Sequence, residues 1–525
     1  MQSKRDQVQA HGFMMGRLSS GLLLADPDAP DSPLGRTTRG ILFGLLATVL
    51  VAAGTTVYGL LRPGGNDSWR TGGNLVINRD TGARYLYAQG ALHPVRNYAS
   101  ARLLGGPSMA SVDVGSVSLR GTPVGEPVGI PGAPDTVPGS GELDNGAWHV
   151  CVTGPQGALP STGGAARSPV TAPGATTVVA GAAVRTDAVA GDRGLLVRGP
   201  DGQEYLVWRG SRLPLDAGSD ARDALGYGSA SPVAVSAAFL NALAPGPTLA
   251  PPRVPGRGQA GPELGGEPST VGQVFQVAVP GGSSDYYVLR ADGLAPLTPV
   301  GAALLLGDPA TQKDAYGGTS PRARTLGTDV LRRHRSAVRT ALPDAAGAPV
   351  TPPRPQQVPR GSALCAKVRG GSQGAQITTV LAPLAALAPV AVSTGTQGLQ
   401  APCVKPDAVV VRPGHGALVR ALGASGAAYA GTTYLVAENG VKYRVPSTES
   451  LRALGYDTGD IASVPAPLLA ALPTGADLDR AAASGAVPPR TTAAACGGTD
   501  RGSAQAAGGA SADGRGRNTA AAPTR

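Results

Sequence analysis

The sequence predicts an α+β protein that crosses the membrane once and carries an elongated extracytoplasmic region. Three observations support this fold class: one apolar run long enough to span a bilayer, hairpin signals that recur along the chain, and a composition with 77 Gly, 48 Pro and only 4% aromatic residues among 525. Such a chain is rich in turns and poor in large core side chains, while 42% apolar residues still allow a packed core. We therefore expect a β-rich central domain and four small repeats, each a hairpin followed by a short helix.

The apolar run covers residues 41–61 and contains no charged side chain. As a helix rising about 1.5 Å per residue, it would be roughly 30 Å long, which matches the hydrocarbon core of a bilayer. A cleavable signal peptide has a shorter apolar region close to the terminus, whereas this run begins at Ile41. The run is therefore predicted to be an uncleaved transmembrane anchor.

Cysteine usage orients this anchor. Arginines lie on both sides of the run, so the positive-inside rule does not decide the orientation. All four cysteines follow the run, and an even, sparse number is expected of structural disulfides outside the cytoplasm. We therefore place residues 1–40 in the cytoplasm and the bulk of the chain outside the cell membrane.

The net charge of +10 comes largely from scattered arginines. It suits an anionic cell-envelope surface, and contact with the cell wall is one expectation. A positively charged chain could also bind nucleic acid, but the predicted location outside the membrane argues strongly against that function. No nucleic-acid partner is expected.

Residues 1–40 are expected to form a cytoplasmic helix and a linker. Residues 3–6 resemble a capping box, and one face of the helix that follows carries an apolar stripe of Val8, Met15, Leu18 and Leu22. Three glycines weaken this helix when it is alone, so we predict that the stripe docks on a partner subunit. The alternative is a frayed tail beside the membrane.

Hairpin signals recur in the exterior region as an imperfect internal repeat. The clearest pair aligns Leu196-Val197, Asp201-Gly202, Tyr205-Leu206-Val207 and Leu225-Gly226-Tyr227 with Leu435-Val436, Asn439-Gly440, Tyr443-Arg444-Val445 and Leu454-Gly455-Tyr456. Asp-Gly and Asn-Gly between alternating apolar runs are typical of two-residue hairpin turns. With two shorter copies, the predicted repeats are residues 62–104, 191–250, 270–308 and 429–480.

Two stretches lie between the repeats, residues 105–190 and 309–428, and carry short β-branched runs that favour strands. Because both are flanked by repeats, we expect them to meet in one central domain. Cys151 lies in the first stretch, and Cys365 and Cys403 lie in the second. Residues 481–525, which contain the fourth cysteine, are rich in Gly and Ala and are predicted to be a disordered tail.

Blocks of distinctive sequence run along most of the chain. They include Gln7-Val8-Gln9-Ala10, Arg62-Pro63-Gly64-Gly65, Leu92-His93-Pro94-Val95-Arg96-Asn97-Tyr98, Gly129-Ile130-Pro131-Gly132-Ala133-Pro134-Asp135, Trp148-His149-Val150-Cys151 and Gly414-His415-Gly416-Ala417-Leu418-Val419. With these blocks the chain resembles a known family, the EccB component of the type VII (ESX) secretion system of GC-rich Gram-positive bacteria. The resemblance extends from the first helix to about Leu478.

The resemblance implies a membrane-complex subunit with a short cytoplasmic helix, one anchor and an exterior part. Such a subunit would associate with itself and with other membrane components of the complex, including its ATPase. The resemblance also implies a core disulfide between Cys151 and Cys365. Cys403, Cys496 and the long Gly/Ala-rich tail depart from the family pattern, so the pairing of these last two cysteines stays open.

Signatures of catalysis are weak in this sequence. A nucleotide-binding P-loop needs Gly-Lys-Ser/Thr after a Gly-rich turn, and no lysine in the chain follows a glycine. The family is sometimes described as ATPases, which keeps ATP hydrolysis as an alternative without independent support here. The five histidines, His11, His93, His149, His334 and His415, lack the spacing of a zinc site, so we expect no metal and no cofactor.

The sequence thus predicts a structural, membrane-anchored subunit of a protein secretion complex. The alternative class is an anchored cell-wall-binding protein whose repeats hold glycan. The patterned helix within residues 1–40 separates the two, because a wall-binding module has no use for it on the inner side of the membrane.

Overall fold

The computed structural model describes residues 4–25, 28, 33–61, 67–155, 172–278, 284–371, 374–387, 399–422, 428–493 and 496. The chain forms two compact units, the first made of residues 1–94 and 109–127 and the second of residues 95–108 and 128–525. The predicted tail beyond Cys496 and the block 62–65 lie outside the described residues.

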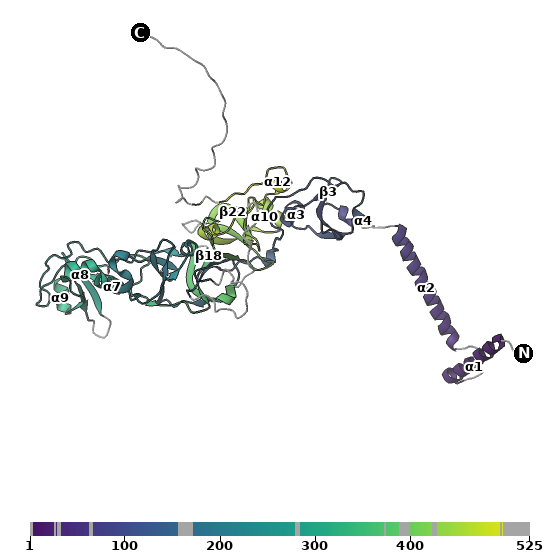
Figure 1. Ribbon diagram of the computed structural model, residues 1–525, viewed down its shortest axis with the longest axis horizontal. Helices are drawn as coiled ribbons and strands as arrows, with labels where there is room; N and C mark the ends of the chain where they lie inside the picture. Colours follow the sequence, from purple (N-terminus) through teal and green to yellow (C-terminus); the bar gives the residue numbers. More distant parts are fainter. Residues whose placement is uncertain are drawn as a thin grey trace, which may run out of the picture. The chain divides into compact units, whose positions relative to one another are not determined.

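Two helices begin the first unit, α1 (Lys4–Leu24) and α2 (Pro33–Leu61). Within α2, residues 37–59 form an apolar span of 23 residues, and Arg39 is its only charged residue. None of this span is buried in the protein (Figure 1). It is the one helix in the described part of the chain that is long and apolar enough to cross a membrane. The helix begins earlier than the predicted run, at Pro33, because proline fits the first turn, where its missing N–H is not needed.

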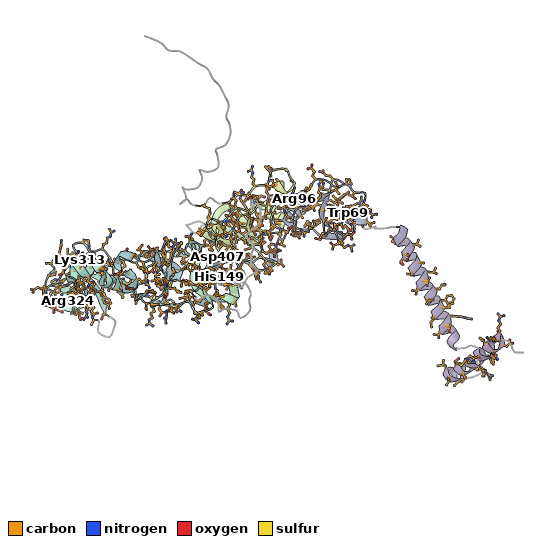
Figure 2. The ribbon with its side chains drawn as sticks, viewed as in Figure 1. Trp69, Arg96, His149, Lys313, Arg324 and Asp407 are labelled. Atoms are coloured by element: carbon orange, nitrogen blue, oxygen red, sulfur yellow. A yellow bond between two sulfur atoms is a disulfide. The ribbon has the colours of Figure 1, made fainter. Side chains whose placement is uncertain are left out.

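A small sheet completes the first unit, in the order β3-β2-β1-β4. Its strands are β1 (Leu75–Asn78), β2 (Arg84–Ala88), β3 (Ala91–Pro94) and β4 (Ser111–Val114), followed by the helix α4 (Ser116–Leu119). Trp69, in the 3-10 turn η1 (Ser68–Arg70), is fully buried and meets the Tyr87 ring edge to face at 5.3 Å. A tryptophan close after the membrane helix is therefore the centre of this core (Figure 2).

The same topology recurs in three sheets of the second unit: three antiparallel strands, then a helix, then a fourth strand parallel to the first. The sets are β8 (Arg193–Arg198), β9 (Glu204–Trp208), β10 (Ser211–Pro214) and β11 (Val233–Ala234); β13 (Val274–Val277), β14 (Asp285–Arg290), β15 (Gly293–Leu297) and β16 (Arg324–Leu326); and β21 (Ala417–Leu422), β22 (Ala428–Val436), β23 (Lys442–Val445) and β24 (Ala462–Pro465). The strands β12 (Ala244–Pro245) and β17 (Arg354–Pro355) extend the first of these sheets.

The alignment that the sequence suggested between two of these sheets is wrong by one strand at its hairpins, although its Leu-Gly-Tyr segments, 225–227 and 454–456, both come at the helix that follows the third strand. Tyr205 to Val207 lie on β9, and their counterparts by topology are Tyr434 to Val436 on β22, because both segments are second strands. The sequence alignment instead matched the β8–β9 hairpin, the first of its sheet, with the β22–β23 hairpin, the second of its sheet. Alternating apolar residues around a glycine turn look the same at both turns of a three-stranded meander, so this pattern does not number its strands.

The central sheet combines strands from both predicted stretches, in the order β20-β6-β5-β18-β19-β7. The strands are β5 (Trp148–Thr153), β6 (Thr176–Val179), β7 (Asp187–Ala188), β18 (Ser362–Gly371), β19 (Gly374–Pro383) and β20 (Ala408–Val410). All six residues of β5 are buried, as expected of a strand covered on both faces.

Several predicted domain boundaries need correction. Strand β4 pairs with β1, β16 pairs with β13, and β21 pairs with β22, so all three belong to the small sheets and not to the central stretches 105–190 and 309–428. Two of these strands are fourth strands, reached through a helix and paired in parallel. Such pairing leaves no local turn signal in the sequence.

Helices of different small sheets pack against one another within the second unit. Helix α3 (Tyr98–Gly105) packs on α10 (Thr448–Leu454) and α12 (Arg480–Ala483), and Arg102 Nη2 donates to the Leu454 carbonyl at 3.2 Å. Likewise α5 (Ala221–Ala224) packs on α7 (Pro299–Gly307). The remaining helices are α6 (Ala237–Ala242), α8 (Pro309–Tyr316), α9 (Thr328–Arg333) and α11 (Ala466–Ala470), with 3-10 turns η2 (Ser140–Glu142), η4 (Ala217–Ser219), η5 (Leu384–Leu387) and η6 (Thr458–Asp460).

The predicted disordered tail is wrong over its first residues. Ala482 and Ala483 in α12 are buried, and Thr492 donates both its N–H and its hydroxyl to the Asp477 carboxylate, at 3.1 and 2.7 Å. Composition alone misjudged this segment, because small alanines pack closely between helices and a buried carboxylate supplies the polar contacts.

Two turn glycines in the sheet of β8, β9 and β10 can be compared to test how closely this sheet packs on the central sheet. Gly202 and Gly210 both have positive φ, at 83° and 77°, but a Cβ on Gly202 would meet open space, whereas one on Gly210 would lie 2.1 Å from the Ile377 carbonyl oxygen of β19. We expect Gly202→Ala to destabilise by about 1–2 kcal/mol through backbone strain alone. Gly210→Ala should lose that amount plus about 1–3 kcal/mol from the clash, measured by urea unfolding. Equal losses would show that β19 gives way freely.

Candidate functional site

The central disulfide joins the two halves of the central sheet. Strands β5 and β18 are antiparallel, and their register places Cys151 directly opposite Cys365. Their Cα atoms are 4.0 Å apart, the sulphur atoms are bonded, and the two residues are 1% and 0% exposed. The bond closes a loop of 214 residues, so it greatly restricts the unfolded chain.

A second disulfide, between Cys403 and Cys496, was not paired by sequence reasoning. Its Cα atoms are 5.3 Å apart and both residues are exposed. The sequence placed Cys496 in a tail without structure, so no partner could be assigned to it. The count of cysteines could have found this bond. Once Cys151 and Cys365 are paired, only Cys403 and Cys496 remain to pair with each other.

His149 is a buried histidine two residues before Cys151 on β5; Figure 2 labels it. It is 2% exposed, and neither ring nitrogen has a hydrogen-bond partner in the described part of the protein. Lys367 lies opposite it on β18. Removal from water, and then the positive charge of Lys367, lower the pKa of His149 to about 4. The ring is therefore neutral at pH 7 and acts as part of the core.

Two other histidines, His93 on β3 and His415 at a turn, lie within hydrogen-bond distance of carbonyl oxygens. His93 Nδ1 lies 3.0 Å from the Glu126 carbonyl oxygen, and His415 Nδ1 lies 2.9 Å from that of Glu142. His415 follows Gly414, whose φ of 73° makes the turn. The described residues contain no group of three His, Cys, Asp or Glu side chains placed to hold a metal ion.

The apolar stripe on α1 is exposed throughout. Val8, Met15, Leu18 and Leu22 are 72%, 55%, 59% and 83% exposed. Phe13, Met14 and Leu23 are exposed as well, so apolar side chains extend beyond the predicted stripe. A soluble helix does not keep so much apolar surface in water, and this surface needs either a partner or a membrane surface.

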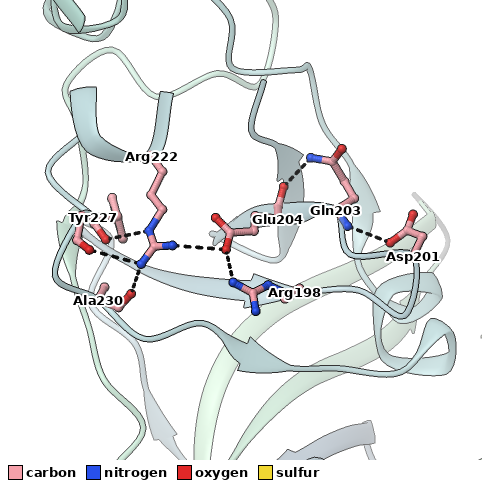
Figure 3. Close-up of polar contacts among 8 residues, drawn as sticks. Arg198, Asp201, Gln203, Glu204, Arg222, Tyr227 and Ala230 are labelled. Atoms are coloured by element: carbon pink, nitrogen blue, oxygen red, sulfur yellow. Dashed lines mark hydrogen bonds and ion pairs between the residues drawn. The ribbon is translucent and has the colours of Figure 1, made fainter. Parts of the chain in front are cut away.

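A polar network fixes the loop between α5 and β11 in one of the small sheets. Arg222 donates to the carbonyls of Tyr227, Gly228 and Ala230 at 3.2, 3.2 and 2.7 Å, and its other side meets Glu204 (Figure 3). Five guanidinium hydrogens suit such a multiple clamp. The loop that contains Tyr227 is therefore held in one place.

The tyrosine of each repeated Leu-Gly-Tyr segment binds a distant proline carbonyl. The hydroxyl of Tyr227 donates to the Pro353 carbonyl at 2.8 Å, and that of Tyr456 donates to the Pro138 carbonyl at 2.6 Å. Both tyrosines are buried, and burial raises their pKa well above the usual range. The sequence marked these tyrosines as repeat positions, but it gave no sign of the proline carbonyls, which lie at least 126 residues away.

This architecture matches one protein family. A family model described as type VII secretion system ESX-1, transport TM domain B, matches residues 1–488. The chain belongs to this family. It is a membrane-anchored component of type VII secretion with a β-rich periplasmic body, as the resemblance in the sequence predicted.

Relatives within the family cover most of the chain. The ESX-3 secretion system ATPase EccB3 of Mycolicibacterium smegmatis is 31% identical over 496 residues, which cover 91% of this chain and 89% of that protein. The ESX-1 secretion system ATPase EccB1 of Mycobacterium tuberculosis is 30% identical over 464 residues, covering 86% of this chain and 88% of that protein.

Solved structures share the fold. The EccB3 dimer from the ESX-3 core complex matches with a TM-score of 0.58 and 27% identity, over 78% of this chain and 99% of that chain. The periplasmic assembly from the ESX-5 inner membrane complex matches with a TM-score of 0.57 and 26% identity, over 78% of this chain and 94% of that chain.

The central disulfide should be worth several kcal/mol to this EccB-family chain. We expect Cys151→Ser to lower the free energy of unfolding by about 2–5 kcal/mol, because the long loop is no longer closed. Thr153→Ser, a buried change on the same strand that breaks no covalent bond, is the control and should cost far less. Denaturant titration under oxidising conditions measures both. Equal stability of Cys151→Ser and the wild type would contradict the assignment.

Burial of neutral His149 predicts acid sensitivity. Its pKa of about 4 in the folded protein lies below the value of 6.5 in an unfolded chain, so its contribution is fully present above about pH 6.5 and is lost as the pH falls towards 4. Between pH 7 and pH 5 the wild type should lose about 2 kcal/mol from this group.

His149→Leu removes this titration, so its unfolding free energy should change less over the same pH interval. Thr153→Ser, a change on the same strand that removes no titrating group, serves as the control and should keep the wild-type slope. Unfolding curves at several pH values give the slopes. Parallel slopes for His149→Leu and the wild type would contradict the prediction.

Proposed function

We propose that this chain is the extracytoplasmic scaffold of its type VII secretion complex, with α1 in the cytoplasm and everything after α2 outside. The position of the disulfides carries the proposal. Both follow the membrane helix, and structural disulfides form and persist in oxidising compartments. One anchor then leaves α1 on the opposite side of the membrane.

The second element of the proposal is that α1 docks on other membrane components of the complex, including its ATPase. Support comes from the exposed Val8, Met15, Leu18 and Leu22, because such a surface is buried when a partner covers it. Self-association is part of the same proposal, and its support is that a matching structure is a dimer of EccB3.

The domain plan belongs to the proposal as well. We infer four repeats that flank a central domain, with the boundaries moved as the strand pairings require. The support is that a three-stranded meander, a helix and a parallel fourth strand occur in four sheets.

ATP hydrolysis by this chain itself is the alternative activity. The relatives are named ATPases, yet the sequence contains no Gly-Lys pair of a P-loop. We therefore propose a structural role in which another subunit hydrolyses the nucleotide. Release of phosphate from ATP by the purified chain, in the absence of any other subunit, would favour the view that this chain is itself an ATPase.

Cell-wall binding is the second alternative, favoured by the net charge of +10. Binding of the purified exterior to isolated wall fragments, together with normal secretion by a chain that lacks α1, would support it. Co-purification with the other membrane components supports the scaffold.

The topology can be tested with intact spheroplasts. Protease added from outside should remove the sheets and leave a small fragment that contains α1 and α2, since the bilayer shields them. Tags at residue 1 and at residue 525 show which end of the chain the protected fragment contains. Protection of the whole chain, with digestion only after lysis, would overturn the orientation.

The role of α1 can be tested with a double variant, Met15→Asp and Leu18→Asp. Two carboxylates placed in a dry interface should cost several kcal/mol, so co-purification of the other components and export should fall sharply. The anchor and the exterior disulfides should be unaffected. Gln9→Asp, at an exposed polar position on another face of the same helix, is the control and should assemble normally. Normal secretion by the Met15/Leu18 variant would show that α1 is only a tail.

A further inference from the structure

The two disulfides of the second unit differ in access. Cys151 and Cys365 are buried between paired strands, whereas Cys403 and Cys496 are both exposed. Exchange requires that a thiolate reach one of the two bonded sulphur atoms, so access decides which bond reacts first. A reductant in solution reaches the second bond without opening any strand.

The loop that carries Cys403 is fixed independently of its disulfide. The Cys403 N–H donates to the Ala470 carbonyl at 3.0 Å, and Gln400 and Thr474 exchange two backbone hydrogen bonds of 2.9 and 3.0 Å. Further along, Asp407 binds Thr176 of the central strand β6 through its N–H, at 2.8 Å, and through its carboxylate, at 2.7 Å. This loop keeps its place when the disulfide opens.

The segment that carries Cys496 is held far less firmly. Among the described residues after Val487, Arg490 accepts from the Asp477 N–H at 2.8 Å, and Thr492 donates twice to the Asp477 carboxylate. Residues 488–490 are exposed. Local opening of such a segment costs little compared with opening a core strand, so its covalent bond to Cys403 contributes a large share of its restraint.

We propose that Cys403–Cys496 is a redox-labile latch on the C-terminal segment, which a dithiol reductant opens while Cys151–Cys365 stays closed. One thiolate of the dithiol attacks a sulphur of the latch and forms a mixed disulfide, releasing the other cysteine as a thiolate. The second thiol of the reductant then displaces the remaining cysteine. The latch gains two electrons and two protons, and the dithiol becomes a disulfide.

Opening the latch would release the described segment 488–493 from its covalent restraint, and leave the sheets intact. The device is thus a switch in the mobility of one segment, and it does not depend on the scaffold role proposed above.

The test uses the full-length chain purified in mild detergent. The protein is treated with dithiothreitol at pH 8 without denaturant, free thiols are trapped with iodoacetamide at intervals, and each cysteine is followed by peptide mass spectrometry. Cys403 and Cys496 should become alkylated at least about a hundredfold faster than Cys151 and Cys365, because the buried pair reacts only when β5 and β18 separate. Similar rates, or earlier reaction of the buried pair, would overturn the proposal.

Release of the segment is read out separately, by hydrogen exchange and by trypsin cleavage after Arg490. Partial reduction should increase exchange in residues 484–493 and speed this cleavage, while exchange in β6 stays unchanged. The variant Cys403→Ser with Cys496→Ser should show the same fast cleavage without reductant. If partial reduction leaves both readouts at the level of the oxidised protein, the bond restrains nothing and the latch is refuted.

Discussion

Strands β5 and β18 pair with each other although their bonded cysteines lie 214 residues apart, and the second unit is organised around this pairing. One face of the pair, with Trp148, Val150 and Val152, packs against residues of two small sheets and of helix α6. The other face holds the disulfide in a smaller apolar cluster. Because two small sheets are packed on one face, any shift in the β5–β18 register by one residue would turn their packing surface away from them.

Local features of the fold could be predicted from the sequence. The anchor follows from one uncharged run, and the hairpins follow from glycine turns between alternating residues such as Tyr205 to Val207. The fourth strands could not be found in this way. Val233–Ala234 in β11 is two residues long, and it pairs in parallel with a strand reached through a helix. Nothing near it in the sequence marks a partner, and the boundary predicted at residue 308 failed for the same reason.

The functional residues also fall into those with a local signal in the sequence and those that depend on distant contacts. The contexts of Cys151 and Cys365 resemble a family pattern and were visible in the sequence, whereas Cys496 was hidden by the composition around it. Burial, and then the charge of Lys367, lower the pKa of His149, and Tyr227 binds the carbonyl of Pro353, so both depend on contacts with residues far away in the chain. The stripe on α1 was found from its spacing, but Phe13 and Met14 show that the apolar surface is broader than the stripe. A partner or a membrane surface that would cover it lies outside this chain, so the sequence of the chain alone does not reveal which.

The packing of α3 on α10 has a consequence for how the protein is made. Arg102 donates to the carbonyl of Leu454, a residue 352 positions later, and the two helices share one core. A chain that emerges from its N-terminus first exposes the apolar side of α3 long before α10 exists. Contacts of such high sequence separation form late and leave apolar surface open to wrong partners in the meantime. The apolar side of α3 therefore stays without its partner helix until residue 454 of the 525 has been made.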